Sequence, residues 1–245
     1  MFGQRIILGN KSKDEAEKPF WISFADLMSA LMVLFLLVMS VALLAVTKPA
    51  SEAEKKVKQR ETEINQLLDK IETATKEFSG VSLNRDRKVI NFGNHASFKN
   101  REFSLDSSTI LDIRNIVSKV VLKYADDELG KKWFKRITVA GFTSKTGSYL
   151  YNLNLSLNRS QSVLCALLTD KPNISNTLSE KELEQVRDLF FIGGYSFNDV
   201  KETEEESRRI ELALEFYGVD DEQPPLLSRI QSGNFGDCQI TYLKR

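Results

Sequence analysis

The sequence has no excess of charge, since its 34 lysine and arginine residues equal its 34 aspartate and glutamate residues. A nucleic-acid-binding face needs basic side chains gathered on one side, so this balance argues against nucleic acid as a partner. Histidine is nearly absent: His95 is the only one, and we expect a structural or surface role for it. Without a nucleophile–base pair, a metal-binding cluster or a phosphate loop, the sequence predicts neither an enzyme nor a bound cofactor.

Cysteine is also scarce, with Cys165 and Cys238 as the only two. No Cys-x-x-Cys and no nearby histidine gives the spacing of a zinc site. In an oxidising compartment the two thiols can form one disulfide, whereas in a cytosol they would remain ordinary buried thiols. The sequence leaves both alternatives open.

Charge is missing from one long stretch. Over residues 20–46 the only ionisable side chain is Asp26, while the flanking segments are densely charged. A run of 27 mostly apolar residues is enough to cross a hydrocarbon core of ~30 Å at a rise of ~1.5 Å per residue. It is too long, and starts too late in the chain, for a signal-peptide core. We therefore expect a transmembrane helix over residues 19–47, after a polar tail of residues 1–18.

Asp26 is the unusual residue of this span. It lies six residues after Phe20, roughly 9 Å along the helix axis and thus within the hydrocarbon. A carboxylate there is unfavourable, and apolar surroundings favour its neutral form, so the group is suited to taking up and releasing a proton. The alternatives are a helix-end residue that reaches the interface, or a hydrogen bond that packs helices together. Aspartate is short and reaches the interface poorly.

Residues 48–80 are rich in Glu, Lys and Gln and have a heptad pattern. Position a falls on Ala50, Val57, Ile64, Ile71 and Phe78, and position d on Ala53, Arg60, Leu67 and Ala74. Only Arg60 interrupts the apolar seam. The pattern predicts a helical connector that dimerises as a parallel coiled coil, so the chain would be a homodimer. The alternative is an amphipathic helix that lies on the chain's own C-terminal domain.

A mixed domain follows over residues 81–218, and a C-terminal tail over residues 219–245. We expect strands at residues 88–92, 136–141, 189–192 and 209–216, and helices at residues 106–124, 149–168 and from 179 within a polar insertion at 170–188. Asp106 or Ser107 is the expected cap of the first of these helices. Strands that alternate with helices and end on a strand predict an α/β sandwich, one sheet covered by two or three helices. A last edge strand is expected at residues 239–243.

Residues 19–28, Pro-Phe-Trp-Ile-Ser-Phe-Ala-Asp-Leu-Met, are similar to the membrane motif of MotB-type stator subunits. The resemblance implies that Asp26 is the proton-accepting carboxylate, on one of two helices inside a ring of MotA-like subunits. Ser23 and Ser29 lie one turn before and after Asp26, and we expect them to hydrogen-bond its carboxyl or a nearby water. A lone carboxylate favours H⁺ over Na⁺ as the transported ion.

A second resemblance covers residues 85–216. The motif residues are Gly141-Phe142-Thr143-Ser144, Gly147, Asn152, Leu155-Ser156, Arg159 and Ser207-Arg208-Arg209-Ile210-Glu211-Leu212. They are similar to the OmpA-like peptidoglycan-binding domain, with its patterns G-H-T-D-x-x-G, N-x-x-L-S-x-x-R and N-R-R-V-E-I. The resemblance implies that the planar guanidinium of Arg159 binds the carboxylate of a diaminopimelate stem. The alternative is an ordinary surface arginine.

The same resemblance implies the rest of the wall-binding site. Its candidate residues are Thr143, Ser144, Tyr151, Asn152, Leu155 and Arg159, with Tyr151 and Leu155 as an apolar rim. The chain departs from the family at Phe142, where histidine is usual, and at Ser144, where an aspartate pairs with the stem's amino group. A hydroxyl accepts a weaker hydrogen bond than a carboxylate, so we expect amine recognition to be weakened or moved.

The membrane motif joined to an OmpA-like domain identifies the chain as a relative of MotB. Its short N-terminal tail, heptad helix and altered wall motif most resemble ZorB, the MotB-like component of Zorya anti-phage defence systems. This resemblance implies a MotA-like (ZorA-like) ring as partner, an inner-membrane location, a cytoplasmic N-terminus and a periplasmic C-terminal domain. Basic residues flank the span on both sides and do not decide its orientation.

Other functions remain open on the sequence alone. They are a flagellar-type motility stator, a passive wall tether of OmpA or Pal type, and a TolR- or ExbD-like energy transducer. The last is disfavoured because such proteins lack the N-x-x-L-S-x-x-R helix.

Overall fold

The computed structural model describes residues 14–169, 177–222, 235–238 and 240. The chain divides into two compact units, Met1–Lys58 and Gln59–Arg245. Helix α1 (Asp14–Thr75) begins in the first unit and ends in the second. Because α1 starts at Asp14, the last part of the tail predicted for residues 1–18 is helical; residues 1–13 lie outside the described part.

In the first unit the apolar run forms helix throughout. Every side chain from Phe20 to Lys48 is exposed, including large apolar ones such as Leu31 and Leu34. Among the described residues this is the one helix that is long and apolar enough to cross a membrane. An apolar surface of this extent needs cover from lipid or from another protein.

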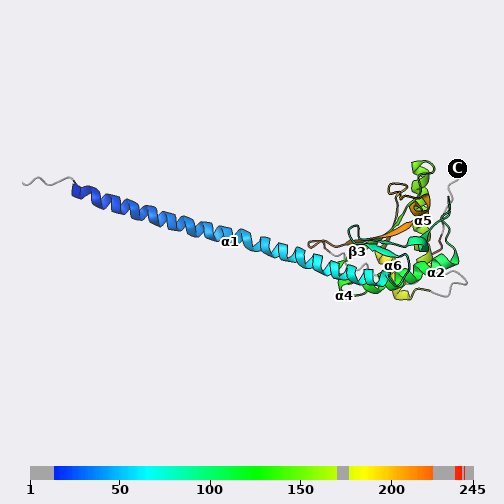
Figure 1. The fold of residues 1–245 in the computed structure, drawn as a ribbon. Helices are drawn as coiled ribbons and strands as arrows, with labels where there is room; N and C mark the ends of the chain where they lie inside the picture. Colours follow the sequence, from blue (N-terminus) through cyan, green and yellow to red (C-terminus); the bar gives the residue numbers. More distant parts are fainter. Residues whose placement is uncertain (1–13, 170–176, 223–234, 239, 241–245) are drawn as a thin grey trace, which may run out of the picture. The chain divides into compact units, whose positions relative to one another are not determined.

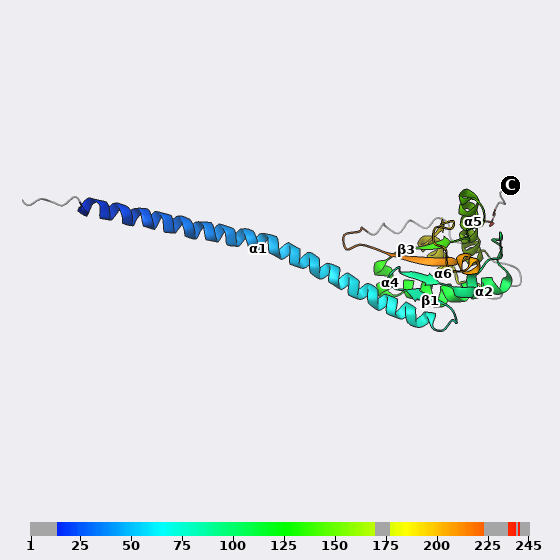
Figure 2. The ribbon, with the colours of Figure 1, turned by 45° about the horizontal axis from the view of Figure 1, so that its top comes forward.

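The second unit is built on a five-stranded sheet with the order β1-β2-β5-β3-β4. The strands are β1 (Ser82–Asn84), β2 (Val89–Asn91), β3 (Phe134–Gly141), β4 (Phe190–Gly194) and β5 (Ile210–Phe216). Strands β3 and β4 are parallel, with Val139 opposite Ile192, and the other pairs are antiparallel. A parallel pair requires a crossover connection, which here contains two helices. In Figures 1 and 2, β3 and β5 lie side by side in the sheet.

The helical elements of this unit are η1 (Gly93–Ala96), α2 (Ser107–Ile116), η2 (Val117–Leu122), α3 (Lys123–Ala125), α4 (Glu128–Trp133), α5 (Tyr149–Leu168), α6 (Glu180–Leu189) and α7 (Glu204–Ser207). The predicted cap is confirmed, since Asp106 accepts a hydrogen bond from the Thr109 amide at 2.8 Å. Strand β1 and helices α4 and α7 were not predicted, because three to six residues are too few for a periodic pattern. The edge strand predicted at residues 239–243 lies, apart from Ile240, outside the described residues.

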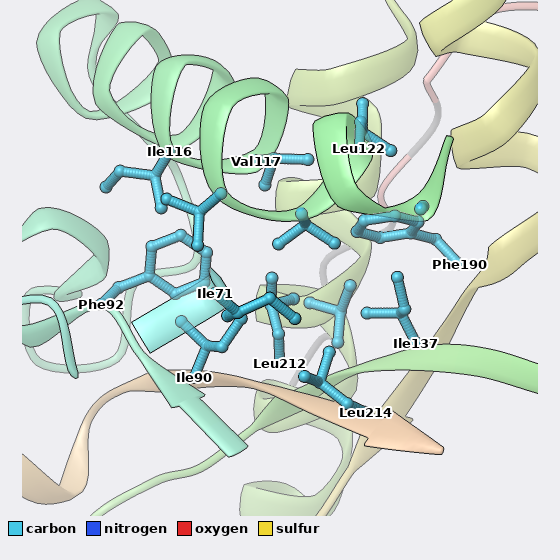
Figure 3. Close-up of a cluster of buried hydrophobic side chains, with 14 of the residues drawn as sticks. Ile71, Ile90, Phe92, Ile116, Val117, Leu122, Ile137, Phe190, Leu212 and Leu214 are labelled. Carbon is cyan, nitrogen blue, oxygen red and sulfur yellow. The ribbon is translucent and has the colours of Figure 1, made fainter. Parts of the chain in front are cut away.

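One apolar core joins the helices to one face of the sheet. Alternate strand residues such as Ile137, Leu212 and Leu214 point into it, as the two-residue period of a strand requires. Figure 3 shows them converging with Ile116 and Leu122 from the helical layer. The predicted α/β sandwich, a sheet covered by helices, is confirmed.

The coiled-coil seam is wrong from Ile64 onward. Ile64, Leu67, Ile71 and Ala74 are each at most 5% exposed and belong to the core of the second unit. They are thus unavailable to a partner helix, and this part of α1 follows the alternative of a helix lying on its own domain. Both structures need apolar residues three and four positions apart, so the pattern did not distinguish them. Val57, at heptad position a in the first unit, is 46% exposed.

Polar contacts also hold this part of α1 in the domain. Lys132 Nζ and Trp133 Nε1 donate hydrogen bonds to Glu63 Oε2 at 2.6 and 2.7 Å. The bond from Lys132, with that from Gln59, lowers the pKa of Glu63 to about 2. Arg60, which interrupts the heptad seam, donates to the carbonyl oxygen of Tyr217 at 2.6 Å. The charged residue at position d therefore has its partner within the same chain.

Candidate functional site

The membrane candidate is Asp26 on the exposed apolar part of α1. Its side chain shares a shallow groove on one helix face with Ser29, Ala30 and Val33. The Ser29 hydroxyl donates to the main-chain oxygens of Ala25 and Asp26, both at 2.9 Å. The Ser29 hydroxyl thus donates to the backbone. The expected contact of Ser23 and Ser29 with the Asp26 carboxyl or a nearby water stays a prediction. The small side chains beside Asp26 let another helix approach the carboxyl closely.

The second candidate lies where β3 passes into α5. Gly141 ends β3, and a Cβ atom there would lie 2.1 Å from the Ser156 carbonyl oxygen, so only glycine lets α5 approach the strand so closely. Ser148 caps α5 by accepting from the Tyr151 amide at 3.4 Å. The loop between these residues carries Thr143 and Ser144 over the first turns of α5.

These elements bring the predicted wall-binding residues together. Thr143, Ser144, Tyr151, Asn152, Leu155 and Arg159 line one small pocket, joined by Asn100, Arg101, Thr146 and Arg208. Its free space is about 10 Å³, roughly what one water molecule needs. The site is assembled in the fold but closed over its own side chains.

Thr143 is the unsatisfied group of this pocket. The residue is 1% exposed, and its hydroxyl oxygen Oγ1 has no hydrogen-bond partner among the described residues. A buried hydroxyl without a partner is unfavourable by about 1–3 kcal/mol. Its amide, in contrast, donates to the Ser196 carbonyl at 2.9 Å, which fixes the loop. The hydroxyl is left available to a ligand.

Arg159 differs most from its predicted environment. It is not a surface arginine, because it is fully buried. Nε donates to the carbonyl oxygen of Glu102 at 2.9 Å, Nη1 to that of Phe142 at 2.9 Å, and Nη2 to that of Lys99 at 3.2 Å. Burial, together with the charge of Arg208, lowers the pKa of Arg159 to about 9. The group is still a cation at neutral pH, and no described carboxylate pairs with it.

Of the two departures from the family motif, Phe142 is explained by packing. Phe142 stacks on Tyr195 with ring centroids 5.3 Å apart, and the guanidinium of Arg209 lies 4.3 Å from the Phe142 ring. Arg209 is in turn held by Asp199, at 2.7 Å, and Glu211, at 2.8 Å. Phe142 thus packs between the Tyr195 ring and the ion-paired guanidinium of Arg209. Ser144 is buried, and the described residues that line the pocket include no acidic side chain in place of the missing carboxylate.

The Asn152 side chain holds the loop between β3 and α5 in place. Its Nδ2 atom donates to the carbonyl oxygens of Thr146 and Ser148 at 3.0 and 3.1 Å. Sequence reasoning did not assign Arg208 and Arg101 to the pocket, although Arg208 belongs to the quoted closing motif. Arg101 lies in a loop with a backbone φ of 62°, and no sequence pattern indicated its position.

Cys165 of α5 and Cys238 are joined by a disulfide, with their Cα atoms 5.7 Å apart. This is the first of the two alternatives that the sequence left open. A structural disulfide is typical of a domain that folds outside the cytosol.

Comparison with known proteins decides the family. The chain is 41% identical over 224 residues to the Zorya protein ZorB of Escherichia coli O139:H28, covering 91% of each protein. The chain belongs to the ZorB family. Membership confirms the resemblance drawn from the membrane motif, the wall motif and the segment between them. As a ZorB-family member, the chain is a MotB-like, stator-type subunit.

The chain is also similar to other known proteins. Residues 9–53 match a family described as membrane MotB of the proton-channel complex MotA/MotB. Among solved structures, a MotB-like protein from Desulfovibrio vulgaris is 16% identical, with a TM-score of 0.40 over 67% of this chain and 99% of that one. The periplasmic domain of Helicobacter pylori MotB is 15% identical, with a TM-score of 0.37 over 58% and 91%.

Proposed function

We propose that the chain is the peptidoglycan-anchored, proton-conducting subunit of a rotary motor in the bacterial inner membrane, and that the motor acts in anti-phage defence. The observation that carries the proposal is Asp26, the one ionisable side chain in an exposed apolar run of residues 20–46. Membership of the ZorB family supports it, because the relative that is 41% identical is a Zorya protein.

Asp26 carries the proton in this proposal. A carboxyl in an apolar helix accepts a proton from one side of the membrane, becomes neutral, and releases the proton to the other side. The membrane potential supplies about 2.3 kcal/mol per charge for each 100 mV, so repeated transfers can drive stepwise motion. A neighbouring helix that packs in the groove at Ser29 and Ala30 would contact Asp26 and shift when the charge of its carboxyl changes.

The motor needs partners that cover the exposed helix. A ring of MotA-like subunits and a second copy of this chain are the proposed neighbours, with lipid around the assembly. The N-terminus lies in the cytoplasm and the second unit in the periplasm, in agreement with the disulfide. Because the heptad residues from Ile64 to Ala74 are buried in the second unit, the dimer would depend on the membrane span and the segment directly after it.

Wall binding rests on Arg159. Its guanidinium donates hydrogen bonds to carbonyl oxygens and also lies 5.0 Å from the centre of the Phe98 ring. Among the described residues this buried cation therefore lacks the carboxylate counter-charge that stabilises such groups in protein interiors. Arg209, whose guanidinium lies 4.3 Å from the centre of the Phe142 ring, pairs with two carboxylates. We propose that a stem carboxylate supplies the counter-charge of Arg159, and that the Thr143 hydroxyl contributes a further hydrogen bond to the stem.

The closed pocket implies how a stem would enter. Two of the three bonds of Arg159 go to the carbonyl oxygens of Lys99 and Glu102, which belong to one short surface segment. If that segment moves outward, Nε and Nη2 become available to a bidentate carboxylate. The bond to Phe142 stays in place and keeps the guanidinium oriented.

The test is an Asp26→Asn variant in the native operon, assayed for plaque formation and for swimming in a motile host. We expect phage protection to be lost and swimming to be unchanged. Asp220→Asn, an exposed residue outside the membrane, is the matched control and should protect like the wild type. Loss of swimming alone would assign the chain to motility, and protection by Asp26→Asn would leave a passive wall tether.

A further inference from the structure

A cleft larger than the stem pocket lies beside it in the second unit, between residues 80–97 and residues 201–209. It has a volume of about 710 Å³, within the range of roughly 300–1,000 Å³ found for small-molecule sites. Its lining is Gly80, Ser82, Asn91, Gly93, Asn94 and Ser97 on one side, and Lys201, Glu202, Thr203, Glu205, Glu206, Arg208 and Arg209 on the other. None of these side chains is apolar.

Both walls of the cleft are held in place by local contacts. Gly80 and Gly93 have φ values of 83° and 55°, and a Cβ atom on Gly93 would lie 2.4 Å from the Gly80 carbonyl oxygen. Glycine at position 93 lets the two loops touch, and glycine at position 80 permits the positive φ of that turn. The opposite wall is ordered by α7, where Thr203 and Glu206 form a reciprocal capping box. The cleft is therefore preformed.

The charges of the lining largely cancel. Arg209 is engaged by Asp199 and Glu211, and Lys201 lies 3.6 Å from Asp199. Groups that remain for a ligand include the Asn94 amide and the Glu202 carboxylate, for which the described residues provide no partner. An apolar ligand or a multiply charged anion does not fit such a surface. A neutral chain rich in hydroxyl and amide groups does, because it both donates and accepts.

Arg208 connects the cleft to the stem pocket. It lines both spaces, and its Nε atom donates to the Phe98 carbonyl oxygen at 3.2 Å, while the Phe98 amide donates to the Arg208 carbonyl at 3.4 Å. This reciprocal pair fixes the boundary between the two spaces. A polymer whose side branch occupies the pocket would place its main chain in the cleft.

We propose that this cleft binds the amino-sugar strand of peptidoglycan while the peptide stem occupies the pocket at Arg159. The proposal rests on the proposed wall binding and adds a second site with a different ligand chemistry. Sugar hydroxyls and N-acetyl groups donate to Glu202 and accept from Asn94. The two sites together give a longer contact with the wall than a stem alone.

The experiment measures binding of the full-length chain in detergent to three probes: peptidoglycan fragments with stems, glycan strands freed of stems by an amidase, and stem peptides alone. The wild type is expected to bind all three. Asn94→Ala and Glu202→Gln should each weaken binding to the stem-free glycan about tenfold and leave stem-peptide binding unchanged. Asn65→Ala, an exposed asparagine on α1, is the control. Retained stem binding demonstrates that each variant is folded.

The outcomes separate the two proposals. If the wild type binds stemmed fragments and stems but not the stem-free glycan, the cleft proposal is overturned and wall binding stands. The same holds if both cleft variants bind the glycan as the wild type does. If the wild type binds none of the three probes, wall binding itself is wrong.

Discussion

The guanidinium of Arg159 donates a hydrogen bond to the carbonyl oxygen of Phe142 at 2.9 Å. Arg159, the last residue of the motif on α5, thus supports the loop that follows β3, where the Gly141-Phe142-Thr143-Ser144 motif lies. Two motifs that are separate in the sequence form one structural unit, with the pocket above it.

Replacing Arg159 should therefore destabilise the domain as well as weaken wall binding. Hydrogen bonds to a charged group contribute about 1.5–3 kcal/mol each, and a lysine ammonium cannot reach three carbonyls in a planar fork. For Arg159→Lys we expect the free energy of unfolding of the second unit to fall by about 2–4 kcal/mol. Denaturant unfolding of the full-length chain in detergent measures this. The control is Arg187→Lys, because Arg187 forms a partly exposed ion pair with Asp188; it should change the free energy of unfolding by less than about 1 kcal/mol. If the two variants were equally stable, the buried structural role of Arg159 would be contradicted.

The two ends of the heptad pattern should respond oppositely to truncation. Ile64→Ala removes a buried side chain and should lower the free energy of unfolding by about 2–5 kcal/mol. Val57→Ala, at the same heptad position but exposed, should change it by about 0.5 kcal/mol or less. Cysteine crosslinking between copies completes the test: Val57→Cys should crosslink in membranes and Ile64→Cys should not. Efficient crosslinking at position 64 would contradict this burial and support a coiled coil that continues past Ile64.

His95 makes stability depend on pH. Its Nδ1 atom lies 2.7 Å from Asp112 Oδ2 and its Nε2 atom 2.8 Å from the Ser79 carbonyl oxygen. Both neighbours are acceptors, so only the protonated ring satisfies both, and the Asp112 carboxylate raises the pKa of His95 above 6.5. The folded pKa exceeds the unfolded one, so this stabilisation is complete below about pH 6.5 and is lost as the pH rises through the folded value.

A His95→Gln variant checks this sign. The melting temperature of the wild type should exceed that of the variant at pH 6, and the difference should shrink towards pH 9. In an Asp112→Asn background, adding His95→Gln should lower the melting temperature at pH 6 by less than it does in the wild type. A gap that widens with increasing pH would mean that the neutral ring is the stabilising form.

The disulfide should be present in the mature protein and should stabilise it. Mass spectrometry of non-reduced protein from membranes should find the Cys165–Cys238 link and no free thiol. The bond closes a separation of 73 residues, for which the chain-entropy model gives up to about 4 kcal/mol. Cys165→Ser with Cys238→Ser should lower the melting temperature, and reductant should lower that of the wild type but not of the double variant. Free thiols in membrane-derived protein would contradict the link.

Local patterns in the sequence were sufficient for much of the fold. Helix α5 has the predicted bounds of residues 149–168, because capping by Ser148 and helical spacing act within a few residues. The Asp106 cap was predicted for the same reason. The families were recognised from short motifs around Asp26 and Arg159.

Tertiary structure alone decided where α1 buries its apolar face and what surrounds Arg159. A heptad pattern states that one face of a helix is apolar, but not whether a second copy or the same chain covers it. An arginine in a motif states its chemistry, but not which carbonyls it meets. Those partners, Lys99 and Glu102, lie 60 and 57 positions away. The sequence by itself was enough to single out Asp26, because a carboxylate within a long apolar run is unusual wherever the chain folds. The closed pocket, the cleft beside it and the pairing of the cysteines arise only when distant segments pack together.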